Sequence, residues 1–191
     1  MTTTQEPVTD VETSPKRVRV PTILQQAATE CGAASLGMVL AHYGLWKSLD
    51  ELRHDLGVDR DGASAQAVVD GGTSFGLESS GKRCATADLG TLSLPAILWW
   101  NRCHFLVLEG ASRGMVHLND PARGQVALPI DEFEAGYSGI ALEFKKTDAF
   151  VKGGHKFSTM GSLWSRLRNS KKGVTFAIYA GVLGTLLGLL I

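Results

Sequence analysis

Helical periodicity and strand-like runs occupy separate parts of this chain, and this separation constrains the fold more than any other feature. Apolar residues recur at three- and four-residue spacing over 30–43, which predicts a helix with Thr29 as its N-cap and Gly44 as its stop. Ser48 and Glu51 have the spacing of a capping box at the start of a second helix. Two helices therefore open the folded part of the chain.

The pattern then changes from helices to strands. A third helix is expected to begin near Ser64, and two adjacent glycines at 71–72 weaken it. Short apolar runs separated by turn residues follow, and they lie at 95–100, 104–109, 115–118, 125–128 and 140–144, with one or two helical turns over 131–135. Because helices come first and strands afterwards, we expect an α+β fold with N-terminal helices packed on an antiparallel sheet.

Composition divides the chain into four segments. Residues 1–18 are rich in Thr, Glu and Pro, which predicts a disordered tail, and residues 19–147 are expected to form one domain. Residues 148–172 read as a basic linker and juxtamembrane neck, because 152–172 holds six Lys or Arg and no Asp or Glu. Residues 173–191 carry no charge and predict the start of a transmembrane helix, with a buried C-terminal helix as the alternative.

The segments and the cysteines indicate the cellular compartment in which the domain lies. Basic residues flank the cytoplasmic ends of membrane spans, so we expect the domain on the cytoplasmic side of the inner (plasma) membrane. The three cysteines have no regular spacing, which argues against a disulfide scaffold and favours a reducing compartment.

Charge and motif content argue against other classes of protein. The net charge is zero, with 19 basic and 19 acidic residues, so no nucleic-acid partner is expected. Neither C-x-x-C nor H-E-x-x-H occurs, so no metal site and no cofactor is expected.

One cysteine has the surroundings of a nucleophile. Cys31 falls in the first turn of the helix predicted over 30–43, where the positive end of the helix dipole favours thiolate over thiol. Small residues at 32–34 allow another backbone to approach closely. Gln25 lies six residues upstream, from where its amide can donate a hydrogen bond to an oxyanion together with the Cys31 backbone N–H. Taken alone, such a cysteine is more often structural.

His104 and Asp120 are the candidates for a base and for the carboxylate that orients it. His104 opens a predicted strand, which fixes its backbone while its side chain reaches a cleft. Asp120 follows the run 115–118, so the two residues meet if these strands form a hairpin. The order Cys, His, Asp along the chain is that of many cysteine proteases. Taken alone, His104 is a polar strand end and Asp120 a turn residue.

Three long motifs then occur in order. Residues 20–38 read VPTILQQAATECGAASLGM, residues 95–108 read PAILWWNRCHFLVL, and residues 119–124 read NDPARG. Together they resemble the bacteriocin-processing peptidases, the papain-like double-glycine leader peptidases that form the N-terminal domain of peptide-exporting ABC transporters. The resemblance covers roughly residues 19–145.

The resemblance implies roles and partners. It implies Cys31 as nucleophile, His104 as general base and acid, Asp120 as its orienting group and Gln25 as oxyanion donor. The implied activity is removal of leader peptides from ribosomal peptide precursors after a Gly-Gly or Gly-Ala motif, with the leader bound as an amphipathic helix. The implied partners are the membrane and the transmembrane and ATPase domains of an exporter, in the same or a separate chain.

An alternative function belongs to another class. Some exporters carry a peptidase-like docking module that has lost its cysteine and binds cargo without cutting it. All four of the residues named above are present here, which favours the enzyme. No Walker A motif follows, so the chain is expected to be either a fragment of an exporter or a separately anchored peptidase.

Overall fold

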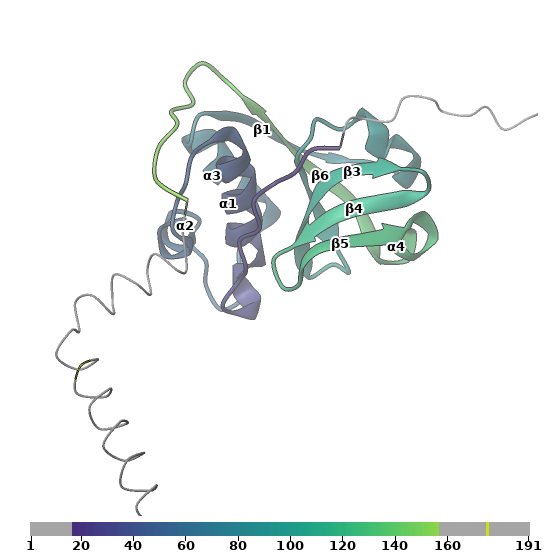
Figure 1. The fold of residues 1–191 in the computed structure, drawn as a ribbon, viewed down its shortest axis with the longest axis horizontal. Coiled ribbons are helices and arrows are strands. Elements are labelled where there is room, and N and C mark those ends of the chain that lie inside the picture. The colour runs from purple at the N-terminus through teal and green to yellow at the C-terminus, as the bar shows by residue number, and fades with distance from the viewer. Residues whose placement is uncertain (1–16, 157–174, 176–191) are drawn as a thin grey trace, which may run out of the picture. The chain divides into compact units, whose positions relative to one another are not determined.

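The computed structural model describes residues 17–156 and Thr175 (Figure 1). The elements in chain order are η1 (Ala28–Glu30), α1 (Cys31–Tyr43), α2 (Leu49–Asp55), α3 (Ala65–Ser74), β1 (Leu77–Arg83), η2 (Thr86–Thr91), β2 (Ala96–Trp100), β3 (His104–Ser112), β4 (Met115–Asp120), β5 (Gly124–Pro129), α4 (Ile130–Gly136) and β6 (Tyr137–Lys146). Within this part of the chain, no helix is both long and apolar enough to cross a lipid bilayer. Residues 1–16 of the tail predicted over 1–18, most of the predicted neck and, apart from Thr175, the segment 173–191 lie outside the described residues.

Helix α1 is the centre of the helical layer. Every residue from Cys31 to Ala41 is buried, because α2 and α3 pack against α1 on the sides that the sheet leaves open. A helix that is apolar all round is stable only when it is enclosed in this way. Figure 1 shows the three helices gathered on one side of the sheet.

The predicted starts of the second and third helices are confirmed. At α2, the Glu51 N–H donates to Ser48 Oγ over 3.2 Å, and the Ser48 N–H donates to Glu51 Oε2 over 2.8 Å. At α3, the Ala67 N–H donates to Ser64 Oγ over 3.1 Å. Side-chain oxygens thus satisfy N–H groups that have no partner inside the helix.

The glycines expected to weaken α3 instead allow it to approach the sheet closely. The helix continues through both glycines to Ser74. A Cβ atom on Gly72 would lie 2.5 Å from Ser79 Oγ and 2.7 Å from the Phe144 ring. Only glycine therefore fits at this contact between α3 and strands β1 and β6.

The predicted antiparallel sheet is confirmed, with one more strand than expected. Its order is β1-β6-β2-β3-β4-β5, and every neighbouring pair is antiparallel. Strand β1 was not predicted because its sequence, LESSGKR, is almost entirely polar. It is an edge strand that pairs only with β6, so most of its side chains face water.

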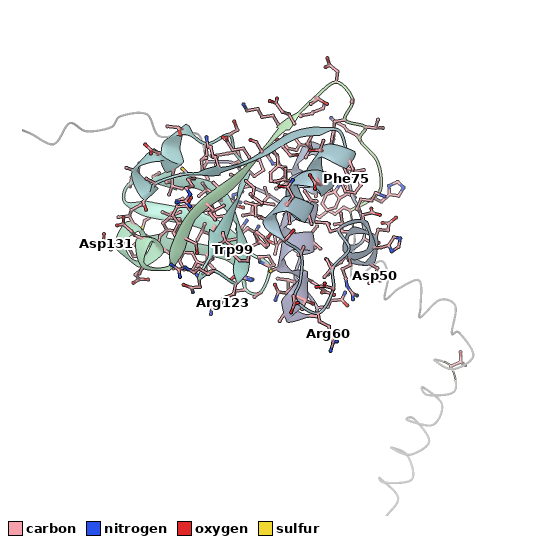
Figure 2. The ribbon with its side chains drawn as sticks, turned by 180° about the vertical axis from the view of Figure 1, so that it is seen from behind. Asp50, Arg60, Phe75, Trp99, Arg123 and Asp131 are labelled. Atoms are coloured by element: carbon pink, nitrogen blue, oxygen red, sulfur yellow. The ribbon has the colours of Figure 1, made fainter. Side chains whose placement is uncertain are left out.

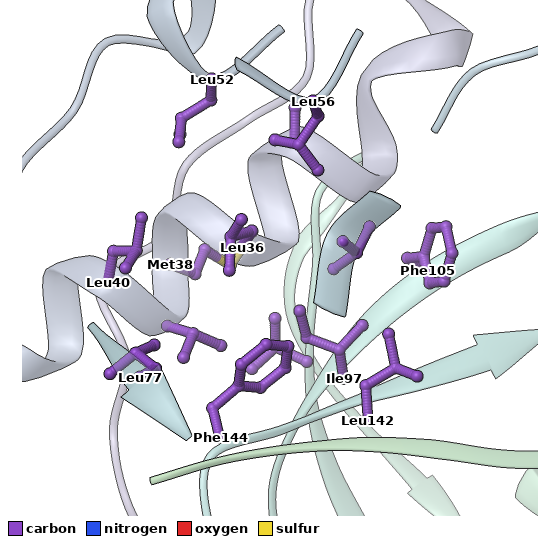
Figure 3. Packing of buried hydrophobic residues seen from close by; sticks show 14 of the residues in the cluster. Leu36, Met38, Leu40, Leu52, Leu56, Leu77, Ile97, Phe105, Leu142 and Phe144 are labelled. Carbon is purple, nitrogen blue, oxygen red and sulfur yellow. The ribbon is translucent and has the colours of Figure 1, made fainter. Parts of the chain in front are cut away.

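Both faces of the sheet are covered, so the central strands have continuous apolar sequences. Ile97, Phe105 and Phe144 belong to the core between the sheet and the helices, part of which Figure 3 shows. Leu98 and Leu106 point to the other face, where Phe133 of α4 packs against them. Successive side chains of a strand point to opposite faces, so neighbouring residues enter two different cores.

An N-terminal strap, residues 17–25, crosses the sheet before the chain enters the helices. The Val18 N–H donates to the Glu109 carbonyl over 2.9 Å, and the Val20 N–H donates to the Glu109 carboxylate over 3.1 Å. The Asn119 amide donates to the Val20 carbonyl over 3.2 Å. Both of these polar residues are fully buried, so the strap is anchored by side chains from inside the sheet.

The chain beyond β6 returns to the helical layer. Phe150 is buried, and its ring lies 6.0 Å from the Tyr43 ring at the end of α1. The Trp46 N–H donates to the Gly153 carbonyl over 2.8 Å, and the Gly153 N–H donates to the Gly44 carbonyl over 3.2 Å. The first residues of the predicted linker are therefore fixed to the loop that follows α1.

The contact at Gly72 predicts a loss of stability on substitution. We expect Gly72→Val to lower the free energy of unfolding by about 1–3 kcal/mol, because the fully buried Phe144 ring leaves no room for the added carbons. Chemical denaturation with circular dichroism measures the change. Thr73→Val at the exposed neighbouring position is the matched control and should stay within about 0.5 kcal/mol. Equal stability of the two variants would contradict the close-contact role of Gly72.

Candidate active site

Cys31 is the first residue of α1, and the packing of this helix on β3 fixes its position. The Ser35 hydroxyl donates to the Phe105 carbonyl over 3.4 Å, which ties the second turn of α1 to β3. At Gly32 an added Cβ would lie 3.2 Å from Val68 and 3.3 Å from the Phe105 ring. The small residue after the cysteine thus lets the helix lie against the strand that begins with His104.

The start of α1 differs from the predicted one. Thr29 is not the N-cap, because a turn of 3-10 helix, η1, occupies the three residues before Cys31. Glu30 precedes the helix, and its carboxylate accepts hydrogen bonds from the Gln26 N–H at 2.7 Å and the Ala27 N–H at 2.9 Å. The pattern did not reveal this start because the N-cap position of η1 is Ala27, which has no side-chain oxygen, so only the glutamate half of a capping box is present.

His104 and Asp120 meet, as the predicted hairpin requires. His104 is the first residue of β3 and Asp120 the last residue of β4, and these strands pair. The His104 Nε2 atom lies 2.8 Å from Asp120 Oδ1. The same oxygen accepts the Ala122 N–H at 2.8 Å, which holds the carboxylate in the turn after β4.

Cys31 and His104 influence each other's protonation. Burial by itself raises the pKa of the Cys31 thiol, but the hydrogen bond to His104 and the backbone at Phe105 outweigh burial, so the pKa is lowered. The hydrogen bond with Cys31 raises the pKa of His104 against the effect of burial, and Asp120 adds to this increase. Because Nε2 bonds to Asp120, Nδ1 is the ring nitrogen left for the thiol. Both shifts favour a thiolate beside an imidazolium.

Gln25 enters the site from the N-terminal strap. Its backbone N–H donates to the Pro121 carbonyl over 2.9 Å, directly after Asp120. Its side chain lines the same cavity as His104 and Asp120. The buried Oε1 atom has no hydrogen-bond partner within residues 17–156.

The cavity beside these residues has a volume of about 530 Å³. Strands β3, β4 and β5 supply an apolar floor, which consists of Leu106, Leu118, Val126 and Leu128. Trp100, Cys103 and Arg123 also line the cavity. Figure 2 shows Arg123 and Trp99 on the sheet side of the domain. Arg123 lies at the same end of the domain as Arg60, which is on the helical side. This floor cannot be recognised from the sequence pattern, because its residues have the apolar character of ordinary core positions.

The site and the fold together define a cysteine peptidase of papain-like type: a helix-terminal thiol, an imidazole from a facing sheet and a carboxylate that orients it. Residues 19–149 match the model of the Peptidase C39 family, and the chain belongs to this family.

Relatives and solved structures agree with this assignment. The chain is 35% identical over 127 residues to the probable microcin-H47 secretion/processing ATP-binding protein MchF of Escherichia coli, and 33% identical over 125 residues to the colicin V secretion/processing ATP-binding protein CvaB of the same species. The matches cover 66% and 65% of this chain but only 18% of each relative.

Among solved structures, a double glycine motif protease from an AMS/PCAT transporter in complex with the leader peptide has a TM-score of 0.68 at 43% identity, and the match covers 71% of this chain and 100% of that chain. The peptidase domain of Streptococcus ComA has a TM-score of 0.62 at 22% identity over 65% of this chain and 97% of that domain, which supports the fold alone.

The coupled thiol and imidazole predict a pH-dependent reactivity. We expect Cys31 to react with iodoacetamide at lower pH than Cys84, because the pKa of Cys31 is lowered while burial raises the pKa of Cys84. His104→Ala removes the hydrogen bond that lowers the pKa of Cys31, so its reaction profile should move to higher pH. Mass spectrometry of the peptides that contain each cysteine measures both profiles. An unchanged Cys31 profile in His104→Ala would contradict the pairing of the two residues.

Proposed function

We propose that this domain is an endopeptidase that removes leader peptides from ribosomally made precursors by cutting after a double-glycine-type motif. The observation that carries the proposal is the thiol of Cys31 at the start of α1, whose pKa is lowered by His104, together with the 2.8 Å contact of His104 Nε2 with Asp120. In this proposal Cys31 is the nucleophile, His104 the general acid and base, and Asp120 its orienting group.

The first half of the reaction forms a thioester. The Cys31 thiolate attacks the carbonyl carbon of the scissile bond, and the oxyanion accepts hydrogen bonds from the Cys31 backbone N–H and the Gln25 amide. The imidazolium of His104 then gives its proton to the leaving nitrogen as the carbon–nitrogen bond breaks. The core peptide leaves with a free amine, and the leader remains bound to Cys31 through sulfur.

The second half hydrolyses the thioester. Neutral His104 takes a proton from a water molecule as the water oxygen attacks the thioester carbonyl. The carbon–sulfur bond breaks, Cys31 leaves as a thiolate beside the renewed imidazolium, and the leader is released with a new carboxyl end. Asp120 stabilises the imidazolium at the start and end of the cycle through its 2.8 Å contact with Nε2.

The burial of the nucleophile supports small residues at the cut. Only 6% of the surface of Cys31 is exposed, so a peptide reaches the sulfur atom only where the residues of the peptide have small side chains or none. Glycine has no side chain, and two such residues before the scissile bond satisfy this restriction. The related double glycine motif protease, 43% identical to this chain, agrees with this choice of substrate.

The cavity supports recognition of the rest of the leader. Its apolar floor lies beside His104 and Asp120, so a segment bound there would approach the proposed general base. An amphipathic helix presents one apolar stripe, which such a floor can bury. The related protease has been solved in complex with its leader peptide.

Coupling to export is the remaining part of the proposal. The relatives MchF and CvaB are secretion/processing ATP-binding proteins, of which this chain matches a limited share. The basic run over 152–172 and the uncharged run over 173–191 support attachment to the membrane with the peptidase on the cytoplasmic side. Transmembrane and ATPase domains, in the same or a separate chain, would complete the exporter.

A cleavage assay tests the function. We expect the detergent-solubilised full chain to cut precursor peptides after the Gly-Gly or Gly-Ala that ends the leader, and Cys31→Ala to bind these precursors without cutting them. Gln25→Ala should lower kcat by about 10²- to 10³-fold, which is the usual loss when one oxyanion donor is removed. Mass spectrometry identifies the cut, and fluorescence anisotropy of a labelled leader measures binding.

Two controls separate the enzyme from the docking module. A leader in which Val replaces the last Gly should bind but not be cut, because its side chain blocks approach to the buried thiol. A wild-type chain that binds leaders and cuts none of them would overturn the peptidase proposal and favour the non-cleaving docking module.

A further inference from the structure

We infer that Glu30 is a positioning residue that holds Gln25 in the cleft from the helical side. The inference rests on the proposed function, in which Gln25 donates to the oxyanion. Glu30 is a carboxylate with 2% of its surface exposed, and the proposed reaction makes no direct use of it. A carboxylate is costly to bury unless hydrogen bonds and a cation satisfy it, so its partners indicate what it fixes.

Those partners all surround the segment between Gln25 and Cys31. Oε2 accepts the N–H groups of Gln26 at 2.7 Å and Ala27 at 2.9 Å, the two residues that follow Gln25. Oε1 lies 3.1 Å from Nε of Arg53, which comes from α2. Glu30 thus closes residues 26–30 into a loop. Gln25 directly precedes this loop, and the proposed nucleophile, Cys31, directly follows it.

Gln25 is therefore fixed from both sides of the cleft. On the sheet side, its N–H donates to the carbonyl of Pro121, next to Asp120. On the helical side, Glu30 holds the following peptide groups. The backbone of Gln25 is thus held on both sides, and its buried side-chain Oε1 atom has no hydrogen-bond partner within the described part of the chain. An oxyanion donor acts only when it is held in place before the charge develops, so this arrangement fits a positioning role.

Within residues 17–156, a second glutamate with almost no exposed surface, Glu109, offers a matched control. Glu109 likewise accepts a backbone N–H, from Val20, and pairs with an arginine, Arg17 at 3.0 Å. Glu109 therefore holds the strap at Val20, five residues before Gln25, whereas Pro121 holds Gln25 itself. A loss of stability is expected at both carboxylates, whereas coupling to Gln25 is expected only at Glu30.

A double-mutant cycle tests the inference. We expect Glu30→Gln to lower kcat by between about 10- and 100-fold while KM changes less than about twofold, because the oxyanion contact is made only in the transition state. In a Gln25→Ala background, Glu30→Gln should cause no further loss of kcat. Glu109→Gln should have the same effect on kcat in both backgrounds.

Two further measurements separate positioning from general damage. The pH profile of Cys31 alkylation should stay unchanged in Glu30→Gln, because the thiol and His104 keep their contacts, and thermal unfolding is recorded for every variant. Should Glu30→Gln not fold, Arg53→Ala takes its place in the cycle, since it removes the Oε1 partner and leaves the cleft untouched.

The outcomes distinguish this inference from the proposed function. An equal loss of kcat from Glu30→Gln with and without Gln25 would overturn the positioning role and leave the peptidase intact. Unchanged kcat in Gln25→Ala would overturn both the oxyanion role of Gln25 and this inference. A wild-type chain that cuts no leader peptide would overturn the proposed function, and the inference with it.

Discussion

The packing of α1 against β3 is the contact on which the rest of the site depends. Cys31 comes from the helical layer, whereas His104 and Asp120 come from the sheet, so the thiol and the imidazole meet only if the two layers approach closely at this point. Gly32 makes the approach possible because a larger residue would press on the Phe105 ring. The lowered pKa of Cys31 and the raised pKa of His104 are consequences of this layer contact.

Backbone segments that cross between the layers are fixed by polar side chains rather than by secondary structure. Glu109 and Asn119 anchor the strap where it lies on the sheet, and Glu30 anchors the residues that follow the strap, before α1 begins. Each of these groups is buried, so loss of a partner leaves a polar atom without water to replace it. Non-regular backbone beside a cleft can be held as firmly as a strand when buried polar groups satisfy it.

Sequence patterns predicted the helices, the antiparallel hairpin and the residues that meet in the cleft, because these depend on local periodicity and on the order of the strands. They did not predict β1, whose polar sequence forms a strand only because β6 provides a partner. The true start of α1 depends on the carboxylate of Glu30 reaching backwards. The apolar cavity floor has the same composition as a core, and two of its residues, Leu106 and Leu118, are themselves buried. Each of these features depends on contacts between segments that no single window of sequence contains.

The pairing of Gly153 with the loop after α1 has a mechanical consequence. Any pull or displacement carried along the chain that follows β6 reaches the domain at Gly44 and Trp46, the C-terminal end of α1. Cys31 lies at the opposite end of this 13-residue helix, about 20 Å away at 1.5 Å per residue. A rigid buried helix therefore connects the point where load enters to the residue that carries the sulfur atom, so a displacement of this loop along the helix axis would be carried to the cleft.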